Sequence, residues 1–261
     1  MAARSRVLLP LLLALGCQRQ VAQERRAPGP IDTGSLRPLT LQYRGAHRGE
    51  HRPWFYTAHM RIQPETYAGQ PAWRNRFRIQ HIGPDLGPPP EFESTTVLHR
   101  DTLALLEAED VYGGSFGASR TRMVSRNGRL VGQVEEGERR TPIDIDAPGF
   151  VVRDLDLLLM SLPLRVGYRS SFAFLDDGER KLRRFSIAAL RRGRVRVPAG
   201  EFDALHVAVT PLDGNQRMAT TCEVRVQEPR IVLRKQYVVN PATVGPIKRS
   251  VGTEELVSIG D

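Results

Sequence analysis

The sequence contains very little cysteine. Only Cys17 and Cys222 occur among its 261 residues, so the folded domain has no internal framework of disulfide bonds. Cys222 lies in an alternating run in which Thr220, Cys222 and Val224 share one face. This pattern predicts a buried cysteine that packs as a small apolar residue. The stability of the domain must therefore come from its core.

The sequence also has no apolar run at its start that is long enough to span a bilayer as a helix. The run "VLLPLLLALG", residues 7–16, follows the basic residues Arg4 and Arg6 and is typical of an export signal. Gly16 before Cys17 gives the end of this segment a resemblance to a bacterial lipobox. We expect a lipid on Cys17, with simple secretion as the alternative.

These features predict three parts of the chain and a location. Residues 1–16 are a signal peptide, residues 17–36 are a flexible tether rich in proline, glycine and arginine, and residues 37–261 form one β-rich domain. We expect the protein in the periplasm or on the periplasmic face of the outer membrane, held there by its lipid anchor.

Lysine is scarce, although the net charge is +9. Without Arg4 and Arg6 the exported part carries 9 − 2 = +7, and almost all of its cations are arginines. Arginines concentrate in residues 180–196, where an anionic membrane surface is one possible partner and a solvated strand face is the alternative. No nucleic acid partner is expected, because no recognition helix or zinc finger pattern is present.

Most of the chain after residue 37 alternates with a period of two. "WFYTAHMRI" and "YRSSFAF" are examples, and Asn127-Gly128 between two such runs is a strong hairpin signal. The exception is the apolar segment from Phe150 to Leu164, which we interpret as a short helix packed on the sheet, with a buried strand as the alternative. The predicted fold is mainly β, a curved antiparallel sheet or half-open barrel with one short helix on its face.

Two strings imitate catalytic motifs. "HRGEH", from His47 to His51, fits a zinc protease string, but Gly49 and Pro53 disfavour the helix that such a site needs. "GGSFG" around Ser115 fits a nucleophile elbow, but a hairpin rather than a helix follows it. A hydrolase that uses Ser115 or a metal at His47 and His51 is therefore the alternative function, and the preferred prediction has no catalytic residues, no metal and no cofactor.

The string "VRVPAGEFDALHVAV" predicts a hairpin corner. Pro198 fixes φ, Gly200 supplies a positive φ, Phe202 returns to the core, and the Asp203 carboxylate is expected to cap turn amides. Together with "LPLRVG", residues 162–167, this string resembles a bacterial family of exported domains of unknown function. The resemblance is strongest over residues 150–210, and it implies a β-rich fold of the lipoprotein-carrier type around an apolar hollow.

The predicted function is that of a non-enzymatic envelope protein. It binds an apolar or lipid-like ligand or supports envelope assembly, and a structural scaffold for another envelope protein is a further alternative. A strongly twisted sheet brings the apolar faces of its strands together, and one short helix covers little of so wide a sheet. We expect an apolar pocket lined by seven residues: Trp54, Tyr56, Met60, Phe77, Phe172, Phe174 and Leu233.

Overall fold

The computed structural model describes residues 31–49, 54–82, 91–114, 117–176, 180–214, 219–239 and 250–260. Its strands are β1 (Leu39–Gly49), β2 (Trp54–Tyr67), β3 (Gln70–Ile82), β4 (Glu91–His99), β5 (Leu105–Gly113), β6 (Ser119–Arg126), β7 (Arg129–Glu136), β8 (Arg139–Asp146), β9 (Val151–Val152), β10 (Arg169–Asp176), β11 (Lys181–Val197), β12 (Gly200–Pro211), β13 (Thr220–Arg225), β14 (Val232–Val239) and β15 (Ser250–Gly260). A 3-10 turn, η1 (Thr33–Ser35), and an α-helix, α2 (Leu155–Ser161), are the helical elements of these residues.

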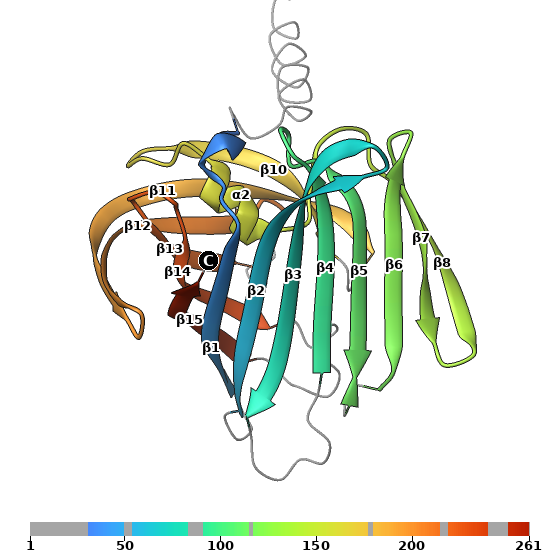
Figure 1. Cartoon of the computed structure of the whole chain (residues 1–261), viewed down its shortest axis with the longest axis horizontal. Coiled ribbons are helices and arrows are strands. Elements are labelled where there is room, and N and C mark those ends of the chain that lie inside the picture. The colour runs from blue at the N-terminus through green and yellow to red at the C-terminus, as the bar shows by residue number, and fades with distance from the viewer. Residues whose placement is uncertain are drawn as a thin grey trace, which may run out of the picture.

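All the strands belong to one sheet of 15 strands, in the order β8 to β1 followed by β15 to β9. Neighbours in the sequence pair with each other, except β8 and β9, which lie at opposite edges of the sheet. The first and last of these strands, β1 and β15, pair in the centre. The exception to the antiparallel pairing is the short parallel contact of β9 with β10. We call β1 to β8 and β9 to β15 the two meanders. They curl toward each other, and α2 lies between them (Figure 1). The prediction of a mainly β, curved antiparallel sheet with one short helix is confirmed.

The hairpin at Asn127-Gly128 is confirmed by its backbone geometry. Asn127 has φ 50° and Gly128 has φ 74°, as a two-residue turn between paired strands requires. β6 and β7 continue directly from it, with Arg126 opposite Arg129.

The corner between β11 and β12 also has the predicted turn. Val197 lies opposite Gly200, and Gly200 has φ +137°, a backbone conformation in which a β-branched residue would be strained. Phe202 is half-buried and packs against the core. The role predicted for Asp203 was wrong, because its carboxylate pairs with Arg192 at 2.9 Å instead of capping the turn.

The helix is shorter than the predicted Phe150–Leu164. Val151 and Val152 form β9 instead, and α2 begins only after Asp154, whose carboxylate accepts a hydrogen bond from the Leu157 amide at 3.0 Å. Asp154 thus ends the extended segment and caps the helix. Every residue from Asp156 to Ser161 is buried, so the helix is enclosed against the inner face of the curled sheet (Figure 1).

The folded domain begins earlier than predicted. The Asp32 amide donates to the carbonyl of Ser161 at 2.7 Å, and Ser35 and Leu36 are buried. Residues 31–36 therefore belong to the domain and not to the tether. The predicted signal peptide, Cys17 and the rest of the predicted tether lie outside the described residues.

The core consists of two clusters of buried apolar side chains. The first centres on β1, β2 and β3 and includes Leu233 of β14. The second lies between α2 and strands β10 to β14, and contains Phe172, Phe185 and Cys222. The predicted burial of Cys222 is confirmed, at 1% exposure. Burial raises the pKa of its thiol well above the ordinary value, so at neutral pH it is an uncharged packing residue.

Among the described residues, no helix is both long and apolar enough to cross a bilayer.

Candidate functional site

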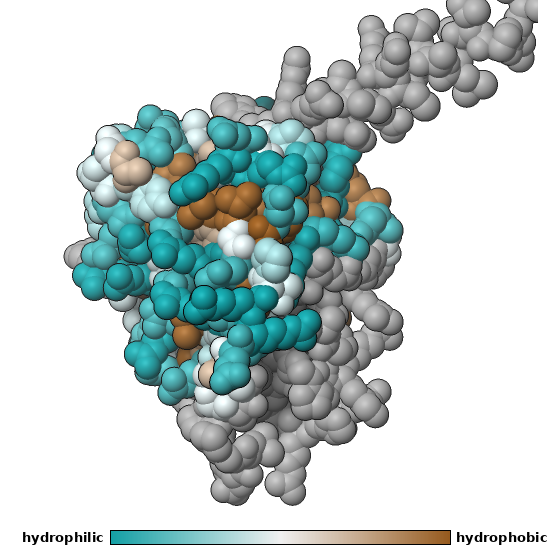
Figure 2. All heavy atoms as spheres, turned by 90° about the vertical axis from the view of Figure 1, so that its right-hand side faces the viewer, coloured by the Kyte–Doolittle hydropathy of each residue, from teal (hydrophilic) through white to brown (hydrophobic). Residues whose placement is uncertain are grey.

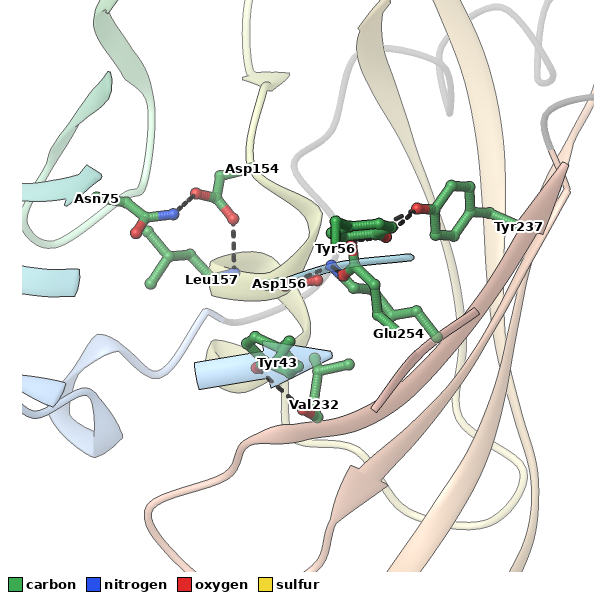
Figure 3. A network of polar contacts seen from close by, with 10 residues as sticks. Tyr43, Tyr56, Asn75, Asp154, Asp156, Leu157, Val232, Tyr237 and Glu254 are labelled. Atoms are coloured by element: carbon green, nitrogen blue, oxygen red, sulfur yellow. Dashed lines mark hydrogen bonds and ion pairs between the residues drawn. The ribbon is translucent and has the colours of Figure 1, made fainter. Parts of the chain in front are cut away.

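A buried polar cluster lies at the centre of the molecule, where α2 meets the sheet. Lys235 of β14 contacts Asp156 of α2 at 2.9 Å and Glu254 of β15 at 2.8 Å. Tyr56 of β2 donates to Glu254 at 2.7 Å, and the hydroxyls of Tyr56 and Tyr237 are 2.6 Å apart. Figure 3 shows Tyr56, Asp156, Tyr237 and Glu254 converging from separate elements. We refer to Tyr56, Asp156, Lys235, Tyr237 and Glu254 as the polar cluster.

Two glycines make room for the two tyrosines. Gly45 lies opposite Tyr56 and Gly252 lies opposite Tyr237 in the strand pairs. A Cβ at Gly45 would be 1.9 Å from the Tyr56 ring, and one at Gly252 would be 2.5 Å from the Tyr237 ring. Each ring therefore lies flat over the neighbouring strand, and this position brings its hydroxyl to Glu254.

The electrostatics of the cluster favour charged Lys235 and Glu254. Burial opposes the charge of both groups, but the ion pair outweighs it, so the pKa of Lys235 is raised and the pKa of Glu254 is lowered. For Asp156, burial is the larger effect and the pKa is raised. Burial, together with the charge of Glu254, raises the pKa of Tyr56 and of Tyr237, so both remain neutral hydrogen-bond donors.

Further polar contacts connect the start of α2 to strands β3 and β5, which belong to the other meander than β14. Asp154 accepts a hydrogen bond from Asn75 of β3, and Arg153 forms an ion pair with Asp110 of β5. With Asp156 bound to Lys235, the segment from Arg153 to Asp156 is connected to both meanders. Removing one partner of such a buried pair is costly, even where the pair adds little net stability.

Beyond the polar cluster, a row of aromatic side chains crosses β3, β4 and β5. The Lys235 ammonium lies 5.7 Å from the centre of the Phe77 ring. Phe77 contacts Phe92 with ring centres 6.4 Å apart, and Phe92 contacts Tyr112 at 4.8 Å. We call Phe77, Phe92 and Tyr112 the aromatic row. All three are half-buried, in contrast to the fully enclosed helix.

The residues predicted to line one pocket are divided between the two core clusters. Tyr56, Met60 and Leu233 are buried in the first cluster, where Phe77 packs against them. Phe172 is buried in the second cluster, with Phe174 packed against that cluster. The side chain of Trp54 lies outside the described residues. The helix contributes side chains to both clusters, and the structure does not bring the six described side chains into one group.

Of the three residues of the hydrolase alternative, the structure describes His47. His47 is buried at 6% exposure, with its ring stacked on Tyr56 at 5.3 Å and edge-on to Tyr237 at 5.8 Å. Ser115 and His51 lie outside the described residues. Within the described ranges, no group of three or more His, Cys, Asp or Glu side chains is placed to hold a metal ion.

Lys235, Glu254 and Asp156 were not predicted as site residues from the sequence. One signal could have found Lys235. In "IVLRKQYVV" it shares the alternating face of Leu233 and Tyr237, which predicts an inward-facing lysine. Nothing in the local sequence indicates that Glu254 and Asp156 are its partners.

Apolar side chains also reach the surface on the side of the molecule where β7 and β8 lie. Figure 2 shows an apolar band across the upper part of that side, bordered by hydrophilic side chains. Among the described residues, Ile145 of β8, Phe150 before β9 and Leu182 of β11 are half-buried and pack against the first core cluster. The apolar interior is thus only partly covered near the edges of the sheet.

The architecture defines a class: an open, curled β-sheet protein that encloses a helix and resembles a barrel without closing into one. The structure of a beta-barrel-like protein of the domain of unknown function DUF1849 from Brucella abortus is similar to it, with a TM-score of 0.54 at 10% identity, over 88% of this chain and 98% of that chain. This likeness concerns the fold alone.

The chain belongs to DUF3108, a family of proteins of unknown function, whose model matches residues 55–239. The matched range contains the aromatic row, α2 and Lys235, while Glu254 follows it. The predicted membership of a β-rich family of unknown function is confirmed. The chain matches no curated protein.

Proposed function

We propose that the protein is an exported envelope protein, anchored by a lipid on Cys17, that binds an amphiphilic, lipid-like molecule without chemically changing it. The observation that carries the proposal is the aromatic row, which runs half-buried from Lys235 across β3 to β5. Large apolar side chains that remain partly open on the inside of a curled sheet are typical of a ligand site.

The ligand's apolar part would lie along Phe77, Phe92 and Tyr112. Rings at these spacings offer a continuous surface for an acyl chain or a flat hydrocarbon. The polar part would lie at the end of the row where the Lys235 ammonium is 5.7 Å from the centre of the Phe77 ring. An amphiphile with a small polar head therefore fits the arrangement better than a purely polar molecule does.

Non-enzymatic binding agrees with the state of the polar cluster. The contacts of Lys235, Glu254 and Tyr56 are made within the protein, as in a structural network. A catalytic group would need to reach a reacting atom instead.

A fluorescent fatty-acid probe tests this function. Phe92→Asp should weaken binding by at least tenfold, because it places a charge within the aromatic row. Phe55→Asp is the matched control, since Phe55 is 50% exposed and lies on the outer face of β2. The Phe55→Asp variant should bind the fatty-acid probe with the affinity of the unmodified protein.

Phe172 is unsuitable as the test position. It is 3% exposed and stacks on Phe185 in the second core cluster, so Phe172→Asp would report on stability. Phe92→Ala serves if Phe92→Asp does not fold, and it should weaken binding several-fold. Absence of probe binding by the unmodified protein would overturn the proposal and favour the structural scaffold.

A further inference from the structure

A second surface lies on the outside of the molecule, where the turn after α2 meets β11. The Gly167 amide donates to the carbonyl of Ala189 at 2.9 Å, and the Ala189 amide donates to the carbonyl of Tyr168 at 3.0 Å. The register of β11 against β12 shifts between Ala189 and Arg191, so Leu190 is the extra residue of a bulge. The bulge and the turn are therefore held side by side.

This junction carries two exposed aliphatic side chains. Val166 is 56% exposed and Leu190 is 48% exposed. They come next in the chain to Gly167 and Ala189, the two residues joined by the backbone hydrogen bond. Most large apolar residues of the described chain are covered, so two open aliphatic residues on adjoining segments form a small apolar surface.

Exposed arginines surround these two residues. Arg165 precedes Val166, Arg191 follows Leu190, and Arg169 lies opposite Ala188 in the pairing of β10 with β11. None of the three has an acidic partner among the described residues. Arg192, the next residue, is paired with Asp203 at 2.9 Å. We call Arg165, Val166, Arg169, Leu190 and Arg191 the basic patch.

The basic patch lies near the place where the described chain begins. Asp32 is hydrogen-bonded to Ser161 at 2.7 Å, and Val166 follows Ser161 by five residues, a span of at most about 17 Å. Between Cys17 and Ile31 there are 31 − 17 = 14 peptide steps, which reach about 50 Å when fully extended. An anchor on Cys17 would therefore keep Ile31 within about 50 Å of the membrane, and the basic patch lies toward the same end of the domain.

We propose that the basic patch docks on an anionic phospholipid bilayer, with Val166 and Leu190 inserted among the headgroups and the three arginines bound to phosphates. The chemistry matches, since arginine grips phosphate in a bidentate way and exposed aliphatic side chains gain from leaving water. This inference goes beyond ligand binding. The nearness of the patch to the membrane rests on the proposed lipid anchor on Cys17, whereas the exposed arginines and aliphatic side chains do not depend on it.

Vesicle flotation of the full chain tests the proposal. The vesicles are phosphatidylcholine alone, or phosphatidylcholine with phosphatidylglycerol. The combined variant Arg165→Gln, Arg169→Gln and Arg191→Gln should lower partition into the anionic vesicles on the order of 100-fold, at about fivefold per arginine. Partition into the neutral vesicles should not change, because the N-terminal segment is the same in both proteins.

A matched control removes the same charge elsewhere. Arg76→Gln, Arg78→Gln and Arg126→Gln alter exposed arginines of β3 and β6, and this triple variant should lower anionic partition less than fivefold. Val166→Ser with Leu190→Ser should lower it several-fold at an unchanged melting temperature, because both positions are exposed.

The outcomes separate this proposal from the proposed function. Equal losses in the two arginine triples would show that only net charge matters and would overturn the basic patch, as would an unchanged partition of the first triple. Binding of the fatty-acid probe should be the same in both triples, because none of these arginines belongs to the aromatic row. Loss of probe binding alone would leave the membrane proposal standing.

Discussion

The two ends of the curl differ in how they are filled. At one end, α2 is enclosed and its start is connected to both meanders through Asp154, Asp156 and Arg153. Along β3 in the other direction, two residues after Asn75, the aromatic row begins at Phe77, and its rings are only half-buried. One continuous sheet forms both ends.

The difference shows how a sheet of this width can be stable and still keep an open apolar surface. Enclosing the helix completes the core at one end and requires buried charges to hold it. The polar cluster forms the boundary, since Lys235 contacts Asp156 on one side and the Phe77 ring on the other. The helix end should therefore govern stability, and the aromatic end should govern binding.

The largest expected effect comes from breaking the polar cluster. Lys235→Met should lower the free energy of unfolding by about 3–5 kcal/mol, because Asp156 and Glu254 would remain buried without their common cation. Urea denaturation measures the change. Adding Asp156→Asn and Glu254→Gln to Lys235→Met should recover much of the loss. A loss below about 1 kcal/mol in the single variant would contradict a stabilising role for the helix end.

An intermediate effect is expected where Tyr56 lies over the neighbouring strand. Gly45→Ala should cost about 1–3 kcal/mol, because its Cβ would displace the Tyr56 ring and separate the hydroxyl from Glu254. Gly193→Ala is the control within β11, where a Cβ meets no atom within 4 Å. It should leave stability unchanged or raise it slightly. Thermal melting compares the two, and equal effects would contradict the close packing at Gly45.

The smallest expected effect is a pair of opposite pH dependences at the boundary. The pKa of Glu254 is lowered in the folded state, so its stabilisation is present above its ordinary value of 4.5 and is lost as the pH falls through the folded value. The pKa of Asp156 is raised, so its contribution is present below its ordinary value of 3.8 and is lost as the pH rises through the folded value.

The two variants should therefore diverge between pH 6 and pH 4. Glu254→Gln should reduce the loss of stability on acidification, and Asp156→Asn should increase it. Free energies of unfolding at the two pH values measure both slopes. The same slope in the two variants would contradict the opposite directions of the two pKa shifts.

The sequence by itself determined the local structure, because strand and turn signals depend on residues close together in the chain. The alternation around Tyr56, Met60 and Cys222 fixed which side chains face the core, and Asn127-Gly128 and Gly200 fixed two reversals through their positive φ. The apolar segment before Pro163 correctly indicated a helix, although Asp154 delays its start until Leu155 by capping it.

Only the tertiary structure decided which faces meet. Whether Phe172 lies beside Phe77 or in a separate cluster depends on the pairing of β1 with β15, which joins the first and last strands of the described residues. The same pairing brings Glu254 to Tyr56, while α2 delivers Asp156 to Lys235 across 79 residues. Long-range contacts of this kind leave no periodic signal in the sequence, because each partner satisfies its own strand or helix pattern equally well without the other.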